Sequence, residues 1–175
     1  MPVRTVQDLF VEELRDIYHA ERQITKALPK MAKAASSPEL KQAFELHLEQ
    51  TRGQIERLDQ VFEQLDLPKR AKKCEAMEGL LEEARATMED IEDDGVLDTS
   101  MIINAQKVEH YEIAGYGSLV ALAKQLGHDQ AASLLAETLA EEKQTDQTLS
   151  KLALTLADKP GAGQGGRRAQ ARATA

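Results

Sequence analysis

Four long segments of the chain carry apolar residues at alternating intervals of three and four positions, the spacing that lines one face of a helix. The first predicted helix follows Thr5, a suitable N-cap, and contains Pro29, which is expected to kink it or to split off its last turn. Ser37 and Pro38 are typical of an N-cap and a first helical residue, and they open a second helix over about residues 38–66. The short turn between the two helices makes them antiparallel.

The second half of the chain repeats this plan after a connection of about 30 residues. A shorter amphipathic helix is predicted over about residues 75–91, and the acidic stretch after it leads into a loop at Gly95. Long helices are predicted over residues 98–127, ending at Gly127, and over residues 129–157, capped by Asp129. Two antiparallel hairpins joined by a long crossover predict an all-α, ferritin-like four-helix bundle over residues 1–158.

Acidic residues interrupt three of the four apolar stripes. Glu21 lies at the centre of the first, Glu109 and Glu112 lie in the third, and Glu142 lies in the fourth. Glu109 and Glu112 precede the turn at Gly127 by about as many residues as Glu142 follows it, so the four acids are expected at one level of the bundle. Burying an ionised carboxylate is costly unless a cation or a hydrogen-bonding partner compensates it.

This arrangement predicts a metal site with mainly oxygen ligands, suited to one or two ions of iron or manganese. The second helix offers Gln54, which faces inward at the same level, and Asp146 lies beside the acid of the fourth helix. Tyr116, one turn beyond the third-helix acids, is placed to hydrogen-bond a ligand. The candidate ligands are Glu21, Gln54, Glu109, Glu112, Glu142 and Asp146. The alternative is that these acids pair with Arg, Lys or His side chains, or that they rotate toward an end of the bundle.

The four histidines lie away from the centres of the stripes and are expected at the surface or at helix edges, with His47 nearest to the core. The single cysteine, Cys74, excludes an internal disulfide and agrees with a reducing compartment. The N-terminus does not resemble a signal peptide, and no apolar run is long enough to cross a membrane, so a cytoplasmic protein is expected.

The charge of the chain separates its body from its C-terminal end. The net charge is −8, yet residues 159–175 contain four basic residues and no acid. We expect this segment to be a flexible basic tail, because its composition cannot bury enough apolar surface to fold. An acidic body argues against nucleic-acid binding, except through that tail.

Several stretches resemble the YciE/YciF-like family of bacterial ferritin-like, rubrerythrin-related stress proteins. The resemblance covers about residues 3–157 and is carried by residues 20–23, 47–51, 73–80, 106–117 (QKVEHYEIAGYG), 141–143 and 145–146. It implies a ferritin-like fold, a homodimer and a link to the bacterial stress response.

The wider superfamily of di-iron proteins carries Glu-x-x-His motifs on its second and fourth helices, and this chain departs from both. Arg52 stands in the histidine place after Glu49, and Thr145 follows Glu142, with Asp146 as the expected substitute. Two hypotheses follow: a metal-binding stress protein with oxidase-, peroxidase- or catalase-like chemistry, or a non-catalytic association protein with a vestigial site. Iron storage in a large cage is a third, weaker hypothesis.

Overall fold

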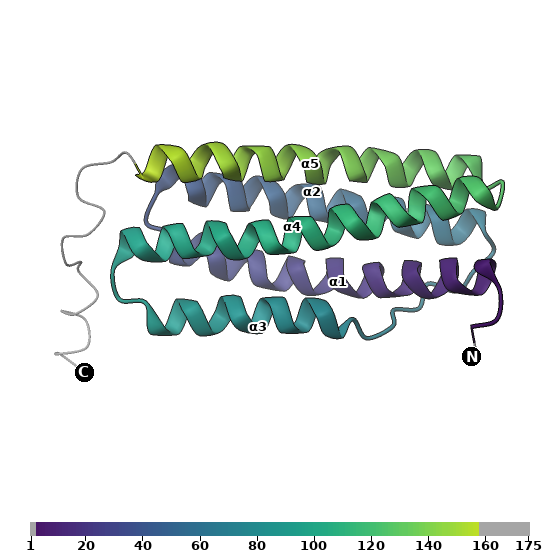
Figure 1. Cartoon of the computed structure of the whole chain (residues 1–175), viewed down its shortest axis with the longest axis horizontal. Helices are drawn as coiled ribbons and strands as arrows, with labels where there is room; N and C mark the ends of the chain where they lie inside the picture. The colour runs from purple at the N-terminus through teal and green to yellow at the C-terminus, as the bar shows by residue number, and fades with distance from the viewer. Residues whose placement is uncertain (1–2, 158–175) are drawn as a thin grey trace.

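The computed structural model describes residues 3–157, and all regular secondary structure in this part of the chain is helical. The four long helices are α1 (Val6–Ala34), α2 (Pro38–Gln64), α4 (Asp94–Gln125) and α5 (Asp129–Ala157) (Figure 1). The shorter α3 (Glu75–Asp90) lies in the crossover between α2 and α4. The predicted all-α bundle with a crossover helix is therefore confirmed. The predicted boundary at residue 158 and the tail over residues 159–175 lie outside the described residues.

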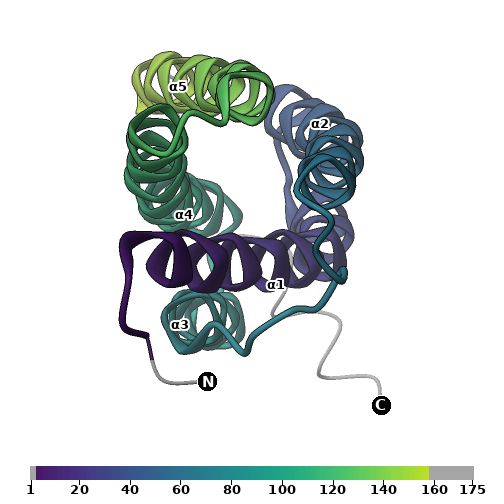
Figure 2. The ribbon, with the colours of Figure 1, turned by 90° about the vertical axis from the view of Figure 1, so that its right-hand side faces the viewer.

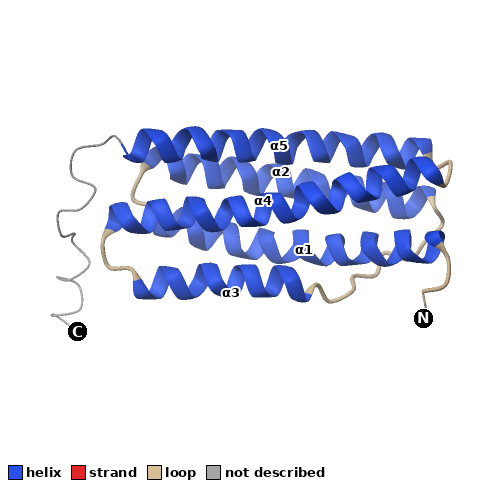
Figure 3. Ribbon diagram, in the orientation of Figure 1, coloured by secondary structure: helices blue, strands red, loops and turns tan. Residues whose placement is uncertain are grey.

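The long helices surround one elongated core, and α3 packs outside it along α1 and α4. Viewed from one end, α1, α2, α5 and α4 enclose the centre of the bundle, while α3 lies on the outer side of α1 (Figure 2). The connections lie at the ends of the helices, except for the long loop that leads into α3 (Figure 3). The middle of the bundle is therefore lined by side chains from four helices. None of the helices within residues 3–157 is both long and apolar enough to cross a membrane.

Local sequence signals set most helix ends as predicted. Thr5 caps α1 in a capping box, in which its hydroxyl accepts a hydrogen bond from the Asp8 amide at 3.0 Å. Ser37 caps α2 directly before Pro38. Gly127 follows α4 with a φ of +76°, and the next amide, from His128, donates to the carbonyl oxygen of Ala123 at 2.9 Å. This C-terminal motif requires a left-handed residue, which explains the glycine.

Of the two effects expected of Pro29, the split does not occur: α1 continues to Ala34, and the buried Met31 and Ala32 hold its last turn against the core. Two predicted helix starts are wrong. The third long helix begins at Asp94 rather than near Asp98, so Gly95 lies in its first turn instead of in a loop. Asp129, predicted as a cap, is the first residue of α5.

Asp98, expected at the start of the third long helix, lies inside α4 and connects it to the first hairpin. Its side chain is 3% exposed and accepts three hydrogen bonds from the turn between α1 and α2. The Ser36 amide and hydroxyl donate at 2.9 and 2.6 Å, and the Ser37 amide donates at 2.8 Å. Because these bonds go to an ionised carboxylate, they tie the first hairpin firmly to the start of α4.

Candidate metal centre

The structure brings the four acids of the apolar stripes together in the middle of the bundle. Glu21 projects from α1, Glu109 and Glu112 from α4, and Glu142 from α5, and the side chain of each is completely buried. Glu109 and Glu112 are one helical turn apart, so both point to the same side of α4. The four acids lie at one level of the bundle because the short turns fix the position of each long helix relative to its antiparallel neighbour.

The second helix contributes a histidine, which the sequence analysis placed at the surface or at a helix edge. His47 is only 4% exposed, and its Nδ1 lies 3.2 Å from Oε1 of Glu109. Its Nε2 lies 4.0 Å from Oε2 of Glu142. One donor atom from each of His47, Glu109, Glu112 and Glu142 can be chosen so that all lie within 4.8 Å of one another. The expectation for this histidine is therefore wrong.

Glu21 adjoins this group from the opposite helix and is held by Tyr116. The hydroxyl of Tyr116 donates a hydrogen bond to Oε1 of Glu21, and both side chains are fully buried. The predicted hydrogen bond from Tyr116 to a candidate ligand is thus present. Oε2 of Glu21 remains without a hydrogen-bond partner. We refer to Glu21, His47, Glu109, Glu112 and Glu142 together as the His–Glu cluster.

The cluster concentrates nearly all the unpartnered buried polar side-chain atoms of residues 3–157. Outside it and the adjoining Gln54, only the Arg15 Nε shares this condition. The unpartnered atoms include both carboxylate oxygens of Glu109, Glu112 and Glu142. A buried acceptor without a hydrogen bond costs about 1–3 kcal/mol. So many buried carboxylate oxygens without hydrogen bonds require a compensating partner. A bound cation can accept electron pairs from several of these oxygens at once.

Burial and mutual repulsion shift the ionisation of the whole cluster. Burial, followed by repulsion from neighbouring glutamates, raises the pKa of Glu21, Glu109 and Glu112 well above the ordinary value. Burial likewise raises the pKa of Glu142 to about 7. Burial lowers the pKa of His47 to about 4, so its imidazole is neutral at neutral pH. Neutral imidazole is the form that binds a metal, whereas the glutamates must give up protons to do so.

Gln54 and Asp146 were also predicted as candidate metal ligands. Gln54 borders the cluster, and Asp146 lies outside it. Gln54 is buried, and its amide donates to Oε2 of Glu141 at 3.1 Å while its Oε1 has no partner. Asp146 is half-buried and accepts from Gln106 at 3.2 Å, and its Oδ1 lies 3.4 Å from Nε2 of His110. The structure therefore directs Asp146 toward polar residues of α4 at the bundle surface.

No lysine or arginine within residues 3–157 forms a salt bridge with a cluster carboxylate. Arg57 on α2 acts on the cluster from a neighbouring position, where its Nη1 donates to Glu141 Oε2 and to the Thr138 hydroxyl, each at 2.9 Å. It also lies 3.7 Å from Oε2 of Glu137. Arg57 lowers the pKa of Glu142 only through a longer-range attraction. Neutralisation by basic residues therefore does not account for the cluster.

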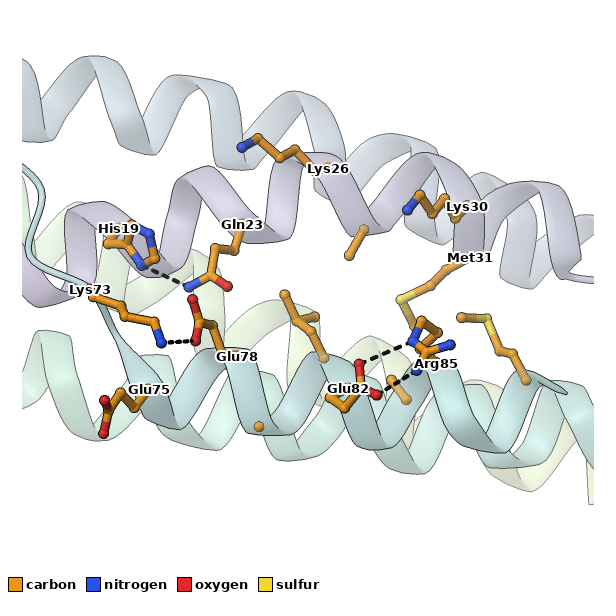
Figure 4. Close-up of a pocket in the computed structure, with 15 residues that line it drawn as sticks. His19, Gln23, Lys26, Lys30, Met31, Lys73, Glu75, Glu78, Glu82 and Arg85 are labelled. Atoms are coloured by element: carbon orange, nitrogen blue, oxygen red, sulfur yellow. Dashed lines mark hydrogen bonds and ion pairs between the residues drawn. The ribbon is translucent and has the colours of Figure 1, made fainter. Parts of the chain in front are cut away.

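A groove on the surface between α1 and α3 is unconnected with the cluster. It has a volume of about 830 Å³ and is lined by none of the cluster residues (Figure 4). Several of its charges are already paired: Lys73 Nζ lies 2.8 Å from Glu78 Oε2, and Arg85 binds Glu82. The candidate site is identified by buried ligand atoms that lack hydrogen-bond partners and lie close together, and not by the volume of a surface groove.

Known proteins share both the sequence and the fold. The family model described as "Domain of unknown function (DUF892)" matches residues 5–160. Protein YciF of Escherichia coli K12 is 54% identical over 147 residues, which cover 83% of this chain and 89% of that protein. The crystal structure of the E. coli stress protein YciF aligns with a TM-score of 0.88 and 52% identity, covering 90% of this chain and all of that one.

Two further solved structures agree with this fold. The protein YcfI of Rhodopseudomonas palustris aligns with a TM-score of 0.83 and 49% identity, over 85% of this chain and 94% of that one. A protein of Xanthomonas campestris aligns with a TM-score of 0.70 over 87% of this chain and 94% of that one, at 23% identity. At that identity the likeness concerns the fold alone.

Proposed function

This chain belongs to the DUF892 family, and we propose that it is a metal-binding stress protein that holds iron or manganese in its His–Glu cluster. The observation that carries this proposal is the set of unpartnered carboxylate oxygens on Glu109, Glu112 and Glu142 at the fully buried centre of the bundle. A cation would replace the missing hydrogen bonds and offset the repulsion among the acids. The link to stress rests on the relatives that carry that description.

The donor set suits a transition metal better than calcium or magnesium. Carboxylates with one neutral imidazole, from His47, are typical of iron and manganese sites in helical bundles, whereas calcium favours more oxygen ligands on flexible loops. Both oxygens of Glu109 and Glu112 are free to bind, so either residue could chelate one ion or bridge two. The proposal therefore covers one or two ions.

Iron or manganese in this position would supply electron transfer to dioxygen or peroxide, the basis for oxidase-, peroxidase- or catalase-like chemistry. The residues of the chain provide the surroundings for it. Tyr116 fixes the orientation of Glu21 through its hydroxyl, and that hydroxyl carries a proton at the edge of the cluster. The apolar side chains above and below, including Ile17 and Ile24 of α1, keep bulk water away from the carboxylates.

Metal analysis of the protein purified without chelator tests the proposal directly. We expect iron or manganese in the wild type, and a rise in melting temperature when either metal is added to stripped protein. The double variant Glu109→Gln/Glu112→Gln should lose the metal. A control with two exposed acids replaced, Glu45→Gln/Glu49→Gln, should keep it.

The same variants separate a working site from a vestigial one. If the cluster never holds a metal, replacing two buried acids should leave stability equal or higher, and no metal-dependent melting shift should occur in any variant. Wild-type protein that contains no iron or manganese and does not respond to either would refute the proposal in favour of a non-catalytic role.

A further inference from the structure

A narrow groove between α2 and α5 ends at His47, on the edge of the His–Glu cluster. Its volume is about 80 Å³. Ala43 and Gln50 of α2 and Thr145 of α5 are half-buried within it, whereas Gln144 and Thr148 lie exposed. The groove therefore connects the bundle surface with the one imidazole of the cluster.

The same pair of helices is closed further along by a polar contact. Arg57 of α2 donates to Glu141 of α5, and Gln54 donates to the same carboxylate at 3.1 Å. The Thr138 hydroxyl accepts from Arg57 at 2.9 Å. These bonds join α2 and α5 on one side of the cluster, and the groove lies between the same helices on the other side, where His47 lies.

The size and chemistry of the groove restrict what can pass. With a volume of about 80 Å³, this groove is far smaller than the groove of about 830 Å³ between α1 and α3. Its lining is apolar or uncharged polar, with hydroxyl and amide groups from Gln50, Thr145 and Thr148. A groove of this size is expected to admit dioxygen, peroxide or azide more readily than a chelator or a metabolite with many atoms.

We propose that this groove is the route by which molecules of two or three heavy atoms reach the metal in the cluster, and that Ala43 sets its width. This inference rests on the proposed metal site and adds its access and size selection. Ala43 has the smallest side chain in the lining and stands on the helix that carries His47. A larger residue at this position would narrow the groove one helical turn from His47.

The larger groove between α1 and α3 provides a matched control. Ala27 is a half-buried alanine in its lining, just as Ala43 is in the narrow groove, and both lie within long helices. No residue of the His–Glu cluster lines the larger groove. The variants Ala43→Leu and Ala27→Leu therefore make the same chemical change beside two grooves, of which only one leads to the cluster.

The experiment measures azide binding to the iron-loaded, air-oxidised protein by stopped-flow absorbance, after the metal content of each variant has been measured. We expect Ala43→Leu to keep its iron and its final absorbance change but to bind azide at least about tenfold more slowly, because azide must then await a local opening of the bundle. Ala43→Val should slow azide binding less than Ala43→Leu does, and it replaces Ala43→Leu in the experiment if that variant does not fold. Ala27→Leu should bind azide at the wild-type rate.

The outcomes separate the route from the metal site itself. Iron-loaded Ala43 variants that bind azide as fast as the wild type would overturn the route and leave the proposed function intact. Iron-loaded wild type that binds no azide would also overturn the route. Wild type that takes up no iron or manganese would instead refute the proposed function, and the route with it.

Discussion

Replacing Glu142 by glutamine should stabilise the metal-free protein at alkaline pH and have little effect at acidic pH. The side chain is completely buried, and burial raises its pKa from 4.5 to about 7. A carboxyl whose pKa is raised by folding favours the native state while it is protonated. Its stabilising contribution is complete below pH 4.5 and is lost as the pH rises to about 7.

The magnitude follows from that difference in pKa. Each pKa unit corresponds to about 1.4 kcal/mol, so the ionised carboxylate costs the folded metal-free protein about 3 kcal/mol at pH 8. At pH 5 the cost is below about 1 kcal/mol, because the group is still mostly protonated in the folded protein. Glutamine has nearly the shape of a protonated glutamate but carries no charge. The variant Glu142→Gln should therefore gain about 3 kcal/mol at pH 8 over the metal-free wild type.

The assay is urea denaturation of chelator-treated protein at pH 5 and pH 8, followed by circular dichroism. The control is Glu56→Gln, which neutralises an exposed acid on α2 and should change stability little at either pH. Adding manganese should stabilise the wild type much more than Glu142→Gln. A metal-free Glu142→Gln protein that is equally or less stable than the wild type at pH 8 would refute the reasoning, since it would mean that the carboxylate is well compensated without a metal.

Three further substitutions test other parts of the structure. His47→Gln should weaken manganese binding by about 10- to 100-fold, measured by the loss of the free-ion electron paramagnetic resonance signal, and unchanged affinity would exclude the imidazole as a ligand. Asp98→Asn should lower the free energy of unfolding by about 2 kcal/mol in urea denaturation, because three hydrogen bonds lose their ionised acceptor; a neutral effect would contradict its role in tying the hairpin to α4. Gly127→Ala should cost about 1 kcal/mol in the same assay, because alanine is strained at a φ of +76°, and a more stable variant would argue against this turn geometry.

The sequence predicted the bundle and its acidic centre because both depend on periodicity and residue counting. Acids in otherwise apolar stripes are conspicuous, and short turns fix the level of each acid relative to its partner helix. Glu21, Glu109, Glu112 and Glu142 were located in this way, and all four are buried at the same level.

His47 was assigned to a helix edge because the predicted stripe on α2 passed through its apolar neighbour Leu48. From Leu40 to Val61, the buried residues of α2 are separated alternately by four and by three positions. Three successive members of this series are polar. The series begins with Leu40 and Phe44 and continues with His47, Thr51, Gln54, Leu58 and Val61. A strict heptad pattern carried through the polar residues would have placed the histidine in the core.

The surroundings of two other acids could not be predicted from the local sequence. Asp98 was expected at the start of the third long helix, because a short acidic residue before an apolar run is typical of an N-terminus. In the structure it accepts hydrogen bonds from Ser36 and Ser37, which are more than 60 residues away in the sequence. Asp146 was chosen for its proximity to Glu142, but it turns toward Gln106 and His110. Long-range hydrogen bonds of this kind leave no local signal.

The spread of the cluster over α1, α2, α4 and α5 determines when an ion can enter. No pair of helices adjacent in the sequence carries the whole set of ligands, and the last of them, Glu142, comes from the final helix. Only a chain whose α5 has joined the bundle presents the complete cluster, so an ion held by all of it binds during or after closure of the bundle. Under the proposed function, each ion bound there displaces protons from the buried acids, and uptake by the metal-free protein should acidify an unbuffered solution.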